Sequence, residues 1–155
     1  MMATTVKIEF AKLQDKAGNY GNPYSHIHGY LNVEIGGRSV PHLGYWGPDD
    51  VCFNDWIEVL SKIRRAVQKG LPSYKFDEFE QGQPAFLFEV KPGSQIALSI
   101  IQSESGEGED DPEWQQVVFS YADFKAAFLA FKLNFLAEIS SIAPEQLAYW
   151  TEKFQ

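Results

Sequence analysis

The sequence predicts an α+β domain: an antiparallel sheet of about five or six strands with helices packed on one face, in the order β-β-α-β-β-β-β-α-α. Three observations favour this class. Several segments alternate apolar and polar residues, two longer segments carry a helical stripe of apolar residues, and the later strands are joined by turns too short for parallel crossovers. A length of 155 residues with 45% hydrophobic residues suits a single domain over residues 1–155.

Period-two alternation defines the first two strands. Val6, Ile8 and Phe10 alternate with charged residues and predict a half-buried strand. The second strand is expected over residues 27–35, where Gly36 and Gly37 end it. Its apolar face looks toward the core and its other face toward solvent. The polar face carries His26, His28, Tyr30, Asn32 and Glu34.

The first helix follows a long irregular stretch, residues 37–54, which contains Tyr45 and Trp46. Asn54 or Asp55 is expected to cap this helix, and Gly70 to end it. Its apolar stripe consists of Trp56, Val59, Leu60, Ile63 and Val67. Because these positions recur at helical spacing, they predict a face buried in the core.

Short hairpin turns and capping signals define the second half of the chain. The strands are expected at residues 74–79, 85–90, 95–102 and 114–119. Ser120 and Asp123 form a capping box that opens a long helix over residues 121–140, and Pro144 opens a final helix over residues 145–154.

The long helix is apolar over much of its girth. Its aromatic stripe consists of Phe124, Phe128, Phe131 and Phe135, and leucines widen it. A helix of this kind buries more than one side. One hypothesis is therefore a homo-oligomer that forms through the Phe124–Phe135 helix.

Composition excludes several function classes. A net charge of −8 and a pI near 4.8 oppose binding to a nucleic-acid backbone. The beginning of the chain has no signal-peptide pattern, and charged residues interrupt its longest apolar stretch, so neither secretion nor a membrane span is expected. The single Cys52 fits the reducing cytoplasm, and its apolar neighbours favour a small buried residue over a nucleophile.

An acid run at residues 104–113 supplies six of the eight net negative charges. Its carboxylates are Glu104, Glu107, Glu109, Asp110, Asp111 and Glu113. Three interpretations are open: a solvated loop, a calcium site and a docking site for a basic protein partner. In the last case, Tyr45 and Trp46 are candidate aromatic anchors.

The most enzyme-like pattern is His26 and His28 followed by Glu34, which share one face of the second strand. Imidazole and carboxylate ligands at this parity are typical of a zinc or iron site. The gap before Glu34 is long, and the remaining histidine, His42, lies in the irregular stretch. No nucleotide-binding or nucleophile motif is found, so we expect neither an enzyme nor a cofactor.

The segment from Ile27 to Gly37, the helix of Trp56 and the later hairpins together resemble small cytoplasmic α+β proteins of bacteria, including immunity proteins of contact-dependent and polymorphic toxin systems. The resemblance covers residues 25–140 and implies a non-enzymatic binder that neutralises a basic toxin domain. The chain departs from that pattern because its acid is confined to one loop. The alternatives are a metal- or small-ligand-binding domain using His26, His28 and Glu34, and a self-associating subunit.

Overall fold

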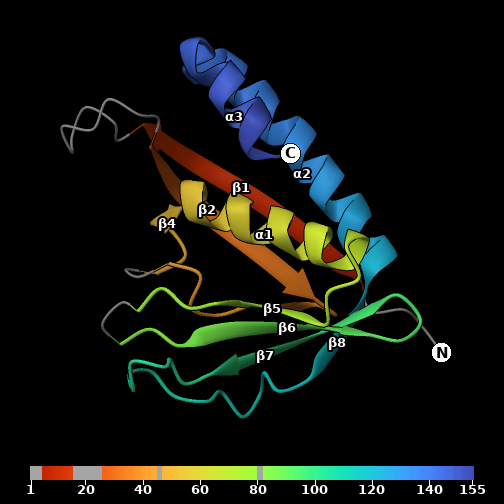
Figure 1. The fold of residues 1–155 in the computed structure, drawn as a ribbon. Coiled ribbons are helices and arrows are strands. Elements are labelled where there is room, and N and C mark those ends of the chain that lie inside the picture. Colours follow the sequence, from red (N-terminus) through yellow and green to blue (C-terminus); the bar gives the residue numbers. More distant parts are fainter. Residues whose placement is uncertain (1–4, 16–25, 45–46, 80–81) are drawn as a thin grey trace.

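The computed structural model describes residues 5–15, 26–44, 47–79 and 82–155. Over these residues the chain forms an α+β fold, as predicted, but its strands make two antiparallel sheets of four strands each instead of one sheet (Figure 1). The physical reason is the position of the first helix, α1 (Phe53–Gln68), which follows the first sheet in the chain and packs against both sheets. The strands before and after it therefore pair only within their own block.

The first sheet is built around a long central strand. Its members are β1 (Val6–Asp15), β2 (Ile27–Ile35), β3 (Arg38–Ser39) and β4 (Val51–Cys52). β2 pairs with β1 along one side and with both β3 and β4 along the other. The predicted alternation of β2 is confirmed, since every second residue from Ile27 to Ile35 is buried. β3 and β4 have two residues each and were not predicted.

The second sheet has the order β5-β6-β7-β8, in which each strand pairs with the next one along the chain. Its members are β5 (Ser73–Phe76), β6 (Ala85–Lys91), β7 (Gln95–Ile101) and β8 (Val117–Ser120). The four later strands predicted from hairpin turns are thus confirmed. The last strand starts at Val117, three residues later than expected, because the backbone of Trp114 bonds that of Asp111 and Ile100 in an irregular turn.

The helices begin and end close to the predicted residues. They are α1, α2 (Tyr121–Ile142) and α3 (Leu147–Lys153), with a short 3₁₀ turn, η2 (Pro144–Gln146), before α3. The cap of α2 is confirmed, because Ser120 Oγ accepts a hydrogen bond of 3.2 Å from the backbone N–H of Asp123. The predicted cap of α1 is wrong: the helix begins at Phe53, and Cys52 occupies the N-cap position. Among the described helices, no segment has the length and apolar character of a membrane span.

The core joins both sheets through α1 and α2. Trp56 of α1 packs edge-on against Phe86 of the second sheet, with ring centroids 5.0 Å apart, and Phe53 stacks on Phe135 of α2. Figure 1 shows α2 running along β1, whose Phe10 contacts the same Phe135 ring.

The aromatic stripe of α2 is inside the molecule. Its four phenylalanines are each exposed by 3% or less. The large apolar side chains that α2 presents to solvent are Leu129, Leu133 and Ile142, exposed by 55%, 60% and 45%. Self-association through this helix stays a prediction, and any second copy would meet these exposed side chains instead of the phenylalanines.

Candidate functional site

Three side chains with metal-binding atoms converge on the polar face of the first sheet. His26 and His28 lie two residues apart and share that face, and the β2–β4 register places Cys52 opposite His28. The two Nε2 atoms are 3.4 Å apart, and Cys52 Sγ lies 3.7 Å from His26 Nε2. All three donor atoms lie within 4.8 Å of one another. We call His26, His28 and Cys52 the donor triad.

A glycine lets the neighbouring strand approach this site. Gly29 pairs with Val51 of β4 and faces a bulge in β1, where Lys12 adopts a positive φ of 56°. A Cβ atom at Gly29 would lie 2.9 Å from the carbonyl oxygens of Ala11 and Lys12. Any other residue would therefore push β1 away from β2 directly beside His28.

A carboxylate orients His28. Its Nδ1 lies 2.8 Å from Asp50 Oδ1, and because an ionised carboxylate only accepts hydrogen bonds, Nδ1 is the protonated nitrogen. In the neutral tautomer that this bond selects, Nε2 carries a lone pair and no proton, and it lies on the side of the ring toward the other two members of the triad. A histidine whose second nitrogen donates to a carboxylate is the usual outer-shell arrangement of a metal ligand.

Asn54, the second residue of α1, ties the segments that carry the triad to each other. Its Oδ1 accepts a 3.1 Å hydrogen bond from the backbone N–H of Ile27, between the two histidines. Its Nδ2 donates to the hydroxyl of Tyr149 in α3, also at 3.1 Å. Cys52 Sγ lies 3.9 Å from Asn54 Oδ1. The side chain thus fixes β2, the start of α1 and α3 relative to one another.

The thiol of Cys52 is not suited to nucleophilic attack. Burial raises its pKa to about 11, and the nearby charge of Asp55 adds to the effect. A catalytic cysteine needs the opposite shift, because the thiolate is the nucleophile. Without a metal this residue is therefore a neutral thiol near pH 7, and a metal that binds Cys52 must displace the thiol proton.

The predicted ligand set His26, His28 and Glu34 is only partly brought together. Glu34 lies six residues beyond His28 on β2, which at about 3.3 Å per residue is roughly 20 Å away. Its carboxylate instead accepts a 3.3 Å hydrogen bond from Asn32 Nδ2. The third donor atom beside the two histidines is Cys52 Sγ instead. Sequence reasoning missed it because nothing local to a two-residue strand indicates which partner that strand pairs with.

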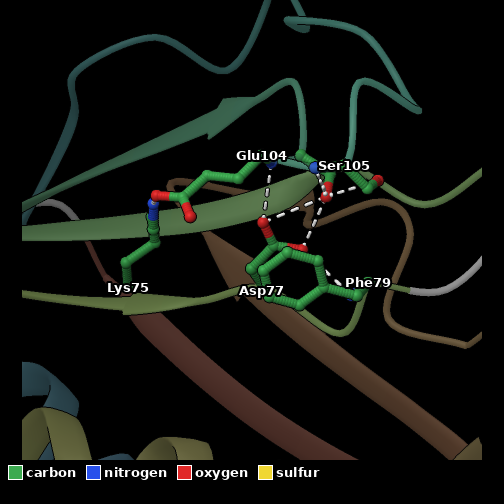
Figure 2. A network of polar contacts seen from close by, with 6 residues as sticks. Lys75, Asp77, Phe79, Glu104 and Ser105 are labelled. Carbon is green, nitrogen blue, oxygen red and sulfur yellow. Dashed lines mark hydrogen bonds and ion pairs between the residues drawn. The ribbon is translucent and has the colours of Figure 1, made fainter.

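The acid run is tied to the second sheet by its own polar contacts. Asp77 accepts hydrogen bonds from Ser103 Oγ at 2.8 Å and from the backbone N–H of Glu104 at 2.9 Å (Figure 2). Figure 2 also shows the ion pair between Lys75 and Glu104, and the backbone N–H of Phe79 donating to Asp77. Burial alone would raise the pKa of Asp77, but these donors together lower it.

Further carboxylates of the acid run also have partners within the molecule. Glu107 accepts from the backbone N–H of Gly82, and Asp110 from that of Gln102. Asp111 accepts from the backbone N–H of Glu113. These bonds hold the turns of the loop, and the run forms no cluster of three converging ligands among the described residues. A calcium site is therefore not favoured.

Docking of a basic partner on the acid run stays a prediction. The aromatic anchors proposed with it, Tyr45 and Trp46, lie outside the described residues. Glu109, which has an exposed side chain, is among the carboxylates that such a partner would reach.

Comparison with known proteins adds no assignment: no protein-family model, curated protein or solved structure matches the chain. The resemblance to immunity proteins thus stays an expectation. The donor triad is the feature of the described residues with the most specific chemistry.

Proposed function

We propose that this protein binds a transition-metal ion, with zinc as the best fit, through His26, His28 and Cys52. The observation that carries the proposal is the spacing of the donor atoms. Zinc bonds of about 2.05 Å to nitrogen and about 2.3 Å to sulfur in a tetrahedron require N–N and N–S separations of about 3.35 and about 3.55 Å. The two separations from His26 Nε2, 3.4 Å to His28 Nε2 and 3.7 Å to Cys52 Sγ, match these edges within about 0.2 Å, and the three donors lie within 4.8 Å of one another.

The donor types select among metals. Two imidazoles and one thiolate suit zinc or copper(I), whereas calcium and magnesium take oxygen ligands. The carboxylate of Asp50 supports the same conclusion, because in the neutral imidazole it places the proton on Nδ1 and leaves Nε2 of His28 to bind a metal. A reducing compartment such as the cytoplasm, which we propose as the location, would preserve Cys52 as a ligand.

Zinc titration of protein purified without a histidine tag tests the proposal. In competition with a chromophoric chelator, the wild type should bind one zinc ion per chain. His28→Ala and Cys52→Ala should each weaken binding by more than about 100-fold, because loss of an outer-shell partner alone costs roughly 10–100-fold.

His42→Asn is the matched control for these variants. His42 is exposed, has a positive φ of 67° that asparagine tolerates, and is not a member of the donor triad. This variant should bind zinc like the wild type. Wild-type protein that binds no stoichiometric zinc, or three variants with equal affinity, would refute the proposal.

A further inference from the structure

The oxygen atoms next to the donor triad are committed to other partners. Asp50 Oδ1 sits on Nδ1 of His28, the ring nitrogen that points away from the triad, at 2.8 Å. Asn54 Oδ1 accepts from the backbone N–H of Ile27. Both groups therefore hold the ligands in place and are poorly placed to become ligands themselves.

The described residues supply three donors where zinc takes four. Within the described residues no other His, Cys, Asp or Glu joins the triad. In structural zinc sites the protein supplies all four ligands, whereas in zinc sites that bind water or substrate the protein supplies three.

Charge and access determine what fills the fourth position. A zinc ion with one thiolate and two neutral imidazoles keeps a net first-shell charge of about +1, so an anionic donor is preferred. All three triad residues are half-buried on the polar face of the first sheet, and the His28 side chain is 15% exposed. The triad side chains are therefore partly accessible to solvent, which an exchanging small ligand requires.

We propose that the metal held by the triad keeps one exchangeable position that takes a small anionic donor from solution, with hydroxide derived from water as the default occupant. This inference rests on the proposed function. A site of this kind resembles metal centres that activate or sense a small ligand. It differs from structural metal centres, which only stabilise a fold. Three-ligand zinc lowers the pKa of a bound water to about 7, so hydroxide is available near neutral pH.

Cobalt(II) substitution with azide as the probe tests this. Cobalt(II) accepts the same tetrahedral site, and its visible spectrum reports both the thiolate ligand, through a charge-transfer band, and the fourth ligand, through its d–d bands. Addition of azide to the cobalt-loaded wild type should shift the d–d bands saturably, with one azide per cobalt, while the charge-transfer band persists. The same response is expected for His42→Asn.

The two proposals fail in different ways. A cobalt spectrum with the charge-transfer band but no response to azide would show a fourth ligand from the protein, which would overturn the exchangeable position and leave the metal site standing. A spectrum without the charge-transfer band would show that Cys52 does not ligate, which would overturn both. In the double variant His28→Ala, Cys52→Ala, an unchanged azide response would also count against the inference, because azide would then be reporting cobalt bound outside the triad.

Discussion

The carboxylate of Asp50 provides the sharpest test of how the donor triad is organised. Asp50→Ala removes the acceptor of His28 Nδ1, which lies 2.8 Å away, without touching a donor atom. The imidazole then loses the partner that fixes its tautomer and orientation. Loss of such a partner typically weakens metal binding by about 10–100-fold, or about 1.4–2.7 kcal/mol.

This loss translates into a measurable change in stability. At free zinc equal to 100 times the wild-type dissociation constant, binding should stabilise the wild type by about 2.7 kcal/mol. For Asp50→Ala under the same conditions the stabilisation should fall to about 1.4 kcal/mol for a tenfold weaker site and to about 0.4 kcal/mol for a hundredfold weaker one. Denaturant unfolding with and without zinc measures both values.

Asp49→Ala is the matched control, because Asp49 is the preceding residue and carries the same charge. Its side chain is 69% exposed and lies 3.8 Å from Lys12 Nζ, in a surface ion pair of small energetic value. It should keep wild-type zinc affinity. If the two alanine variants bound zinc equally well, Asp50 would have no role in orienting His28, and the reasoning would be refuted.

Three further predictions concern stability and are measured by denaturant unfolding. Ser120→Ala should lower the free energy of unfolding by about 1 kcal/mol, because it removes the cap that accepts from the Asp123 N–H; no change would argue against the cap. Phe135→Ala should cost about 3–5 kcal/mol because the ring is fully buried, whereas Leu133→Ala, at a site 60% exposed, should cost far less. Equal costs would contradict the packing of α2. Asp77→Ala should cost about 1 kcal/mol at neutral pH, where the wild-type carboxylate accepts its hydrogen bonds. Because the folded state lowers the pKa of Asp77, this advantage is present above its ordinary value of 3.8 and is lost as the pH falls through the folded-state pKa; a pH-independent difference would contradict the shift.

Much of the fold could be predicted because its signals are local. Alternation identified β2 with the bounds that the structure has, and the capping pair of Ser120 and Asp123 marked the start of α2. These features depend on residues within a few positions of each other. The number of sheets does not depend on such local features. It depends on whether β2 pairs with β5, and no local pattern indicates that α1 packs against both groups of strands.

The candidate site shows the same limit. Parity correctly placed His26 and His28 on one face but also suggested Glu34, which shares the face at the other end of the strand. Cys52 was read as a small buried residue because its neighbours are apolar. Its place beside the two histidines follows from the pairing of β4 with β2, which joins residues 22 and 24 positions apart in the chain through only two residue pairs.

The acid run illustrates a different kind of limit. The sequence shows the charge of this run, but it does not show that the carboxylates accept hydrogen bonds within the molecule. Asp77, which lies outside the run, accepts from Ser103 and Glu104 and so binds the run to the second sheet. The hydrogen-bond partners of Glu107 and Asp110 are backbone N–H groups, which no composition statistic can assign.

X-ray absorption spectroscopy at the zinc edge of the loaded wild-type protein tests the central claim most directly. The donor triad predicts a shell with one sulfur at about 2.3 Å and three lighter atoms at about 2.0–2.1 Å, two of them imidazole nitrogens and the third from the exchangeable ligand. A shell of nitrogen and oxygen atoms without sulfur would mean that Cys52 is not a ligand and would contradict the site proposed here.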